Sequence, residues 1–242
     1  MSESISFVFP MYNEKDNIEE MIFRTMAVGP ELCDDYEIVI VDDASTDGCG
    51  GIVERLAGQH PQVRGLRHPV NRKLGGALKT GFGAATKDIA IYIDSDLPID
   101  MNDIKLALPY IEQADVLIGY RLVRTEGLRR RVISKAYNGL IRRAFGLRVR
   151  DVNFAFKVIR RRVLQAIELH SEGSFIDAEI ILEAKAHGFK VREVGMMFYQ
   201  RTAGKSSLAG TGVILKILAE MWEYWKRTRG RRGRLAPAGP PR

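Results

Sequence analysis

The chain has 242 residues, of which 45% are hydrophobic and 28% are charged. That composition is sufficient for one buried globular domain, and it excludes a disordered, collagen-like or disulfide-stapled chain. The two cysteines, Cys33 and Cys49, are expected to be reduced thiols of a cytosolic protein. No basic leader precedes the first apolar run, and no run reaches the roughly 18 residues of a membrane span. We therefore expect neither a signal peptide nor a transmembrane segment.

Charge is divided unevenly along the chain. Residues 1–118 carry 10 Lys/Arg and 20 Asp/Glu, a net of −10, and residues 119–242 carry 27 and 10, a net of +17, which together give the overall +7. A basic half of this size indicates a polyanionic partner. Nucleic acid, anionic lipid and a phosphorylated acceptor all meet that description, so charge alone does not choose among them.

Short apolar runs alternate with helical patterns through the first 120 residues. The runs are rich in β-branched residues, which is typical of parallel strands covered on both faces. This alternation predicts an α/β protein with a doubly wound sheet. In chain order we expect a strand at 5–9, a helix at 14–26 capped by Asn13, a strand at 36–41, a helix at 49–58, a strand at 63–67, a helix at 75–85, and strands at 89–93 and 115–118.

Three polar clusters follow expected strands, and ligands of such sheets bind beyond the carboxyl ends of the strands. The clusters are Tyr12-Asn13-Glu14, Asp42-Asp43 and Asp94-Ser95-Asp96. Two aspartates at positions i and i+2 after a strand can face one point, and hard cations such as Mg²⁺ prefer carboxylate and phosphate oxygens. The last cluster therefore predicts a metal and diphosphate site, with a solvated acidic loop that caps the next helix as the alternative.

The second cluster and a glycine pair allow more than one interpretation. Asp42-Asp43 can accept hydrogen bonds from a nucleobase or ribose, or it can form a turn and cap the following helix. Gly75-Gly76 lacks the lysine and serine of a P-loop, so we interpret these glycines as positions of close helix packing.

Four motifs together resemble the inverting glycosyltransferases of family 2, which have the GT-A fold. They are Phe9–Glu14, Ile40–Gly48, Asn71–Ala77 and Tyr92–Leu97. The resemblance implies a single Rossmann-like, mostly parallel sheet with helices on both faces, followed by C-terminal amphipathic helices.

The second half is similar to the dolichol-phosphate mannose synthases and related polyprenyl-phosphate glycosyltransferases. Its motifs are Gly119–Arg121, Arg130–Lys135, Asp151–Lys157 and Phe198–Ser206, and the resemblance covers residues 5–208. It implies a metal-dependent hexosyltransferase, using Mg²⁺ or Mn²⁺, that moves a sugar from a nucleotide-sugar to a polyprenyl or dolichyl phosphate at the membrane surface. Mannose from GDP-mannose is favoured by the resemblance only, and glucose or another sugar from a UDP-sugar stays open.

The resemblance also assigns roles to individual residues. Asp94 and Asp96 match the metal and diphosphate ligands. Asp151 is the candidate for a base or a sugar-orienting carboxylate, with a structural contact at a helix end as the alternative. Departures from the family pattern are Pro98, where a polar residue is common, and a lysine that lies early in the last motif. The remaining matches are Pro10, Tyr12, Glu14, Val41 and Asp43 for the nucleoside, Ser95 and Lys205 for the donor, Arg121 and Arg201 for the diphosphate and sugar, and Arg130 and Ser134 for the acceptor phosphate.

Two segments of the second half predict contact with a membrane. Residues 128–146 form a basic amphipathic pattern, and residues 213–225 carry two tryptophans and a tyrosine ahead of a polybasic tail, as interfacial anchors do. The alternatives are a helix packed on the core and a helix packed on a partner or on its own domain. We expect a catalytic domain at 1–210, an interfacial helix at 211–226 and a basic disordered tail at 227–242. The protein would lie at the cytoplasmic face of the membrane, peripherally or through a membrane-embedded partner.

Three rival interpretations stay open. A nucleotidyltransferase also places carboxylates at strand ends, but it would need a glycine-rich, lysine-bearing loop near the N-terminus, and Phe9–Glu14 is not one. A nucleic-acid-binding protein would use the basic half, yet that half has few aromatic residues on strands for base stacking, and its basic residues lie beside apolar helix faces. We therefore expect no nucleic acid partner. A family 2 transferase with a soluble or polysaccharide acceptor is the third.

Overall fold

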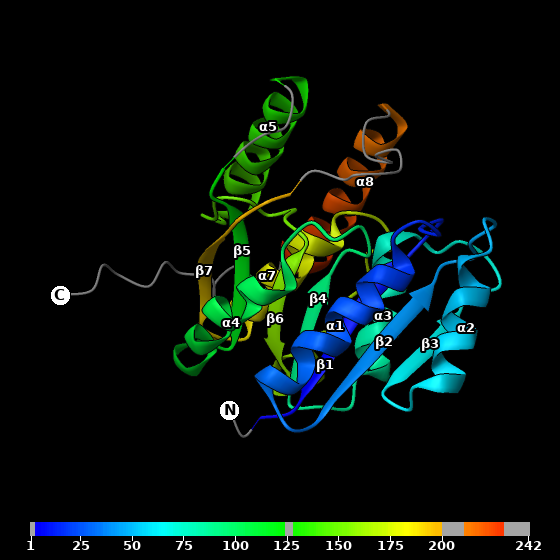
Figure 1. Cartoon of the computed structure of the whole chain (residues 1–242). Helices are drawn as coiled ribbons and strands as arrows, with labels where there is room; N and C mark the ends of the chain where they lie inside the picture. The colour runs from blue at the N-terminus through cyan, green and yellow to red at the C-terminus, as the bar shows by residue number, and fades with distance from the viewer. Residues whose placement is uncertain (1–2, 124–127, 200–210, 230–242) are drawn as a thin grey trace.

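The computed structural model describes residues 3–123, 128–199 and 211–229. Its centre is a seven-stranded sheet of order β3-β2-β1-β4-β6-β5-β7 (Figure 1). All strands are parallel except β6, which runs antiparallel to both β4 and β5. The strands are β1 Ile5–Met11, β2 Tyr36–Asp42, β3 Val63–Arg67, β4 Ile89–Ile93, β5 Val116–Arg121, β6 Phe156–Arg160 and β7 Val191–Met196.

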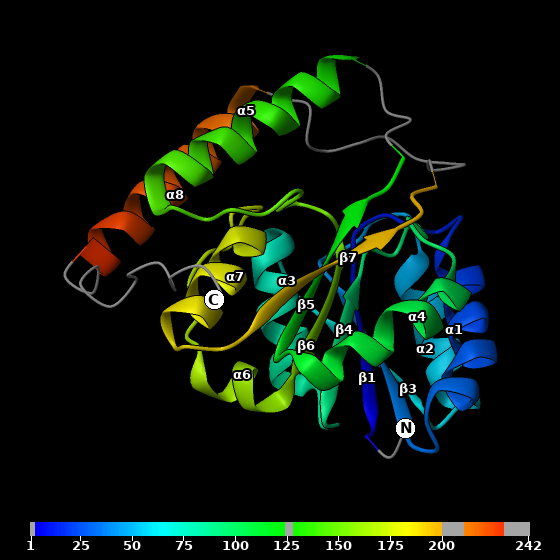
Figure 2. The same ribbon diagram turned by 90° about the vertical axis from the view of Figure 1, so that its left-hand side faces the viewer.

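Helices cover both faces of this sheet, as expected for parallel strands (Figure 2). Alternate side chains of β1 point to opposite faces, so Phe7 packs in one apolar cluster with α1 and α2, while Val8 packs in the other with α3 and α7. The mostly parallel α/β sheet predicted from sequence is confirmed. The helices are α1 Ile18–Leu32, α2 Cys49–Gln59, α3 Lys73–Ala84, α4 Ile104–Ala107, α5 Leu128–Phe145, α6 Arg161–Ala166, α7 Ile176–Ala186 and α8 Thr211–Thr228, with 3₁₀ turns η1 Met101–Asp103 and η2 Leu108–Gln113.

The first helix differs from its prediction. It begins at Ile18 with Asn17 as its N-cap residue and continues to Leu32, beyond the expected end at residue 26. Asn13 is not the cap and has a φ of 55°. Its side-chain oxygen accepts a hydrogen bond from the Thr46 amide at 2.8 Å, so it ties the end of β1 to the turn after β2. Asparagine tolerates this left-handed conformation better than most residues do, which explains its place in the turn.

Helices α5 and α8 lie beside the face of the sheet that α7 covers (Figure 2). The Phe145 ring of α5 meets the Tyr224 ring of α8 edge to face, with centroids 5.4 Å apart. Neither helix, nor any other within the described ranges, is long and apolar enough to cross a membrane. Residues 227 and 228 of the tail expected at 227–242 belong to α8, and residues 230–242 lie outside the described residues. The division into domain, helix and tail therefore stays a prediction.

Candidate active site

The carboxyl ends of β1, β2 and β4 bring the three predicted polar clusters to one edge of the sheet. Met11 at the end of β1 pairs with Asp42 at the end of β2, and the amide of Asp43 donates to the Met11 carbonyl at 2.8 Å. From the other side, the Ser95 hydroxyl donates to the Pro10 carbonyl at 2.8 Å. Hydrogen bonds therefore join the predicted nucleoside and diphosphate positions through β1.

Backbone strain gathers at the same edge. Among the described residues other than glycine, four have a positive φ: Asn13 (55°), Ala44 (63°), Lys73 (64°) and Leu97 (54°). Each lies in the segment that follows one of the strands β1 to β4. Such conformations cost about 1–3 kcal/mol each and cluster where a fold prepares a binding site.

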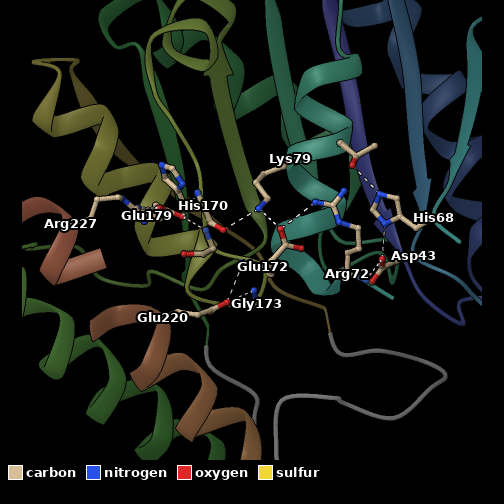
Figure 3. Close-up of polar contacts among 12 residues, drawn as sticks. Asp43, His68, Arg72, Lys79, His170, Glu172, Gly173, Glu179, Glu220 and Arg227 are labelled. Atoms are coloured by element: carbon tan, nitrogen blue, oxygen red, sulfur yellow. Dashed lines mark hydrogen bonds and ion pairs between the residues drawn. The ribbon is translucent and has the colours of Figure 1, made fainter. Parts of the chain in front are cut away.

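Asp43 is held rigidly in this edge (Figure 3). It is 3% exposed, and its Oδ1 atom accepts a hydrogen bond from the Arg72 amide at 2.7 Å. The same atom lies 2.7 Å from Nδ1 of His68, whose Nε2 lies 2.9 Å from the Thr80 hydroxyl. The sequence reasoning missed His68, although it directly follows β3 and the strand-end rule applied to it as well.

The other predicted nucleoside residues differ in accessibility. The Tyr12 side chain is 49% exposed at the edge, where a base could pack on it. The Glu14 carboxylate accepts a hydrogen bond from the Asn17 side chain at 2.7 Å and so supports the start of α1. Val41 is fully buried with its side chain toward α3, so only its backbone could face a ligand.

Asp94 and Asp96 follow β4 as predicted, with Asp96 only 9% exposed. No group of three or more His, Cys, Asp or Glu side chains suited to a metal ion exists among the residues that the structure describes. Two carboxylates without a third protein ligand fit Mg²⁺ or Mn²⁺ completed by phosphate oxygens and water, and they do not fit an all-protein cage. The Pro98 carbonyl accepts a hydrogen bond from the Tyr199 amide at 3.0 Å. The residue that departs from the family pattern therefore contributes a backbone acceptor.

Arg121 and Asp151 form a buried ion pair. Their side chains are 10% and 1% exposed, and Nη1 of Arg121 lies 2.6 Å from Oδ2 of Asp151. The guanidinium also packs on the rings of Phe154 and Phe198, at 5.1 and 4.7 Å from their centroids. Its Nε atom is buried without a hydrogen-bond partner. This geometry favours a role for Asp151 in orienting Arg121, which is neither the base nor the helix-end contact considered for it from the sequence.

A second buried ion pair lies beneath the site, and the sequence did not indicate it. Lys157 of β6 is fully buried and donates to Asp177, in the first turn of α7, at 2.5 Å. In the sheet it faces Tyr92 of β4, with Nζ 5.2 Å from the ring centroid. Burial raises the pKa of Asp177, while the Lys157 ammonium opposes that rise. Burial, followed by the carboxylates of Asp177 and Asp94, raises the pKa of Tyr92 well above its ordinary value.

The structure describes only some of the residues predicted to bind the acceptor phosphate and the donor. Ser134 lies half-buried on α5, which also contains Arg130, whose side chain is not described. Arg201 and Lys205 lie outside the described residues. A hollow between α5 and the segment after it is lined by Lys135, Asn138, Gly139, Arg142, Val149 and Arg150, so its polar rim is basic.

Helix α8 is fastened to the rest of the fold by charged side chains (Figure 3). Arg227 pairs with the buried Glu179 at 2.5 Å. Glu172, in the loop that α8 contacts, pairs in turn with Arg72 and Lys79 of the α3 region. The carboxylate of Glu220 accepts three backbone N–H bonds from that loop, from Glu172 at 3.1 Å, Gly173 at 2.5 Å and Phe175 at 3.4 Å.

The opposite side of α8 carries the aromatic residues of the predicted anchor. Trp222 is 53% exposed and stacks on Trp225, with centroids 4.9 Å apart and ring planes at 11°. Lys226 and Arg229 each lie over one of these indole rings. Tyr224 is buried instead, against α5 and α7. One side of α8 therefore packs on its own domain, and the other presents an aromatic and basic surface.

Comparison with known families agrees with the fold. A sequence model described as glycosyl transferase family 2 matches residues 6–168, and the chain belongs to this family. Its fold is the GT-A fold. Among solved structures, glucosyl-3-phosphoglycerate synthase from Mycobacterium tuberculosis with Mn²⁺, UDP-glucose and phosphoglyceric acid superposes with a TM-score of 0.68 at 19% identity, over 91% of this chain and 80% of that one. A mannosyltransferase from Pyrobaculum calidifontis with GDP-Man and Mn²⁺ gives 0.65 at 18% identity, over 98% and 71%.

Individual curated proteins also match the chain. The chain is 30% identical to an undecaprenyl-phosphate 4-deoxy-4-formamido-L-arabinose transferase from Edwardsiella ictaluri over 223 residues, covering 90% of this chain and 66% of that protein. It is 28% identical to a polyprenol monophosphomannose synthase from Mycolicibacterium smegmatis over 219 residues, covering 85% of this chain and 81% of that protein. The chain thus spans 66% of the length of several formamido-arabinose transferases that it matches, slightly less than two thirds.

Proposed function

We propose that this protein transfers a sugar, with inversion, from a nucleotide-sugar to a polyprenyl phosphate at a membrane surface. The observation that carries the proposal is the single strand-end edge that holds Asp43 on one side and Asp94 with Asp96 on the other, joined through Ser95 and Pro10. Relatives named as polyprenyl-phosphate and polyprenol transferases support the lipid acceptor.

The residues of the edge have distinct parts in this reaction. Asp43, fixed by His68, accepts hydrogen bonds from the nucleoside, and the exposed Tyr12 ring packs on it. Asp94 and Asp96 would hold a divalent ion, Mg²⁺ or Mn²⁺, which when bound neutralises charge on the departing diphosphate. Neighbouring GT-A structures that contain Mn²⁺ support this choice of ion.

The acceptor is an anion near neutral pH, so its phosphate oxygen can attack the sugar without a strong general base. Positioning and electrostatic stabilisation then supply most of the catalysis. We assign Arg121, oriented by Asp151, to the charge that develops on the diphosphate, because the forked donors of arginine match phosphate oxygens. From the family pattern we assign Arg130 and Ser134 to the acceptor phosphate, and Arg201 and Lys205 to the donor diphosphate.

A transfer assay tests the reaction itself. Purified protein, radiolabelled GDP-mannose or UDP-sugars, Mn²⁺ and undecaprenyl or dolichyl phosphate should yield a labelled lipid. Asp96→Ala should abolish that product, whereas Asp35→Asn, at the opposite edge of the sheet where Asp35 pairs with Lys87, should leave it unchanged. Near-normal turnover by Asp96→Ala would contradict the metal assignment.

The donor is proposed to be GDP-mannose, which the polyprenol monophosphomannose synthase relative and the GDP-Man complex support. A UDP-sugar is the competing choice, supported by the UDP-glucose complexes. The rise in melting temperature caused by GDP and by UDP, each with Mn²⁺ or Mg²⁺, distinguishes a GDP-sugar donor from a UDP-sugar donor. A larger stabilisation by UDP than by GDP would contradict mannose transfer from GDP-mannose.

Membrane contact is proposed to be peripheral, at the cytoplasmic face, through the outer side of α8 and the basic hollow beside α5. The stacked Trp222 and Trp225 suit the interface of a bilayer, and the basic residues around them suit anionic headgroups. Trp222→Ala should weaken flotation with anionic liposomes, whereas Leu106→Ala, which removes a 73% exposed side chain on α4, should not. Equal flotation of both variants and the wild type would refute this surface.

A further inference from the structure

Tyr92 places a hydroxyl group inside the sheet, directly below the candidate metal site. The residue is fully buried in the middle layer between β4 and the helices of the α7 face. Its apolar neighbours in that cluster include Val8, Ala90 and Ile118. A phenylalanine would fill nearly the same volume without burying a hydroxyl, and a buried hydroxyl costs about 1–3 kcal/mol if it lacks a partner.

The partner of this hydroxyl is the first carboxylate of the site. Tyr92 donates a hydrogen bond to Oδ1 of Asp94 at 3.0 Å. Because residues i and i+2 of an extended chain point to the same face, the tyrosine reaches the aspartate from the buried side of the sheet. The bond restrains the carboxylate.

The tyrosine is itself held in place from the neighbouring strand. Lys157 lies opposite it in the β4–β6 register, and its ammonium packs 5.2 Å from the centre of the ring. That ammonium is fixed in turn by Asp177 at 2.5 Å and by the Phe154 carbonyl at 3.1 Å. The buried ion pair therefore anchors the ring whose hydroxyl contacts Asp94.

We infer that Tyr92, backed by Lys157 and Asp177, is a positioning residue that orients Asp94 for a diphosphate-bound divalent ion. The inference rests on the proposed function, which assigns that ion to Asp94 and Asp96. Groups that hydrogen-bond to metal ligands commonly alter metal affinity or activity by about 10- to 100-fold when they are removed. The proline at residue 98 increases the dependence on such support, because it offers no side-chain ligand.

The first test removes only the hydroxyl group. Tyr92→Phe should bind GDP, and in parallel UDP, about 10- to 100-fold more weakly than the wild type when Mn²⁺ is present. Without added metal the two proteins should bind equally, as measured by titration calorimetry. Tyr36→Phe is the matched control, because Tyr36 lies at the amino end of β2 and its hydroxyl accepts a hydrogen bond from the Gln62 side chain at 3.5 Å. Circular dichroism and melting curves establish that each variant is folded.

A double-mutant cycle with Asp94→Asn then tests whether Tyr92 acts through Asp94. If it does, adding Tyr92→Phe to Asp94→Asn should change Mn²⁺-dependent nucleotide binding by less than about 3-fold, because coupled neighbours are not additive. Full additivity, or a Tyr92→Phe variant that matches the wild type, would overturn the inference while leaving the metal site intact. If the affinity of the wild type for the nucleotide were the same with and without Mn²⁺, the proposed metal site and this inference would both be overturned.

Discussion

Gly75 in the first turn of α3 offers a sharp test of how the candidate site is supported. Its amide donates to the Glu172 carbonyl at 2.7 Å, so α3 meets the loop before α7 backbone to backbone. A Cβ atom added at Gly75 would lie 2.2 Å from the Ser171 carbonyl oxygen and 2.8 Å from the Glu172 carbonyl carbon. Both are main-chain atoms, which cannot move aside as a flexible side chain does.

The magnitude of Gly75→Ala follows from two opposing terms. Overpacking costs about 1–3 kcal/mol, and the backbone contact argues for the upper end. Alanine recovers about 0.5–1 kcal/mol of conformational entropy in a helix. The expected net loss in the free energy of unfolding is about 2 kcal/mol. In a chain of this length that loss lowers Tm by about 4–8 °C.

Gly83 is the matched control in the same helix. An added Cβ atom there would meet nothing within 4 Å. Gly83→Ala should therefore keep the entropic gain of about 0.5–1 kcal/mol and raise Tm by about 1–4 °C. Urea unfolding followed by circular dichroism measures both variants. A Gly75→Ala protein as stable as the wild type would refute the close approach of α3 to the loop.

Three further variants test other contacts. Asp177→Ala should lower the free energy of unfolding by about 3–5 kcal/mol in denaturant titrations, because it leaves Lys157 buried without a counter-ion; a loss under about 1 kcal/mol would contradict that pairing. Glu220→Ala should lower the free energy of unfolding by about 1.5–3 kcal/mol, because the loop amides lose a charged hydrogen-bond acceptor. Hydrogen exchange at the start of α7 should become faster in the same variant. Burial alone would raise the pKa of Glu37, but hydrogen bonds from Ser6 and Thr86 hold it below its usual range. The Glu37 carboxylate should therefore stabilise the fold above about pH 4.3, and this stabilisation should be lost as the pH falls through the lower pKa of the folded state. The melting temperatures of the wild type and Glu37→Gln should accordingly converge between pH 5 and pH 3. A difference that stays constant over that range would contradict this.

Local sequence was a good guide to the first half of the fold. The strands β1, β2, β4 and β5 contain apolar runs whose type can be recognised without any partner. The strand-end rule located Asp43 and Asp94, because polar residues that follow parallel strands share one edge of the sheet. The close packing expected at Gly75 and Gly76 is confirmed. The cap predicted at Asn13 was wrong, because a long-range bond to Thr46 outweighed its local tendency to cap a helix.

The second half depended on contacts that sequence order does not reveal. The strand β6 enters between β4 and β5 in the opposite direction, although it follows both in the chain. A lysine in such a strand is normally expected to be exposed. Lys157 is nevertheless fully buried, because it forms an ion pair with Asp177, which lies 20 residues later on α7. Likewise, a charged pattern marks α8 as amphipathic but does not indicate that Glu220 fastens it to the loop before α7.

What the sequence determined by itself was the chemistry at the strand ends, since the types and spacing of Asp43, Asp94 and Asp96 are local properties. What the tertiary structure decided was how that chemistry is held. His68 reaches Asp43 from β3, and Tyr92 reaches Asp94 under the restraint of Lys157. The physical reason is that burial and pairing belong to the packed sheet. A side chain acquires its partner only when strands far apart in the chain have come together.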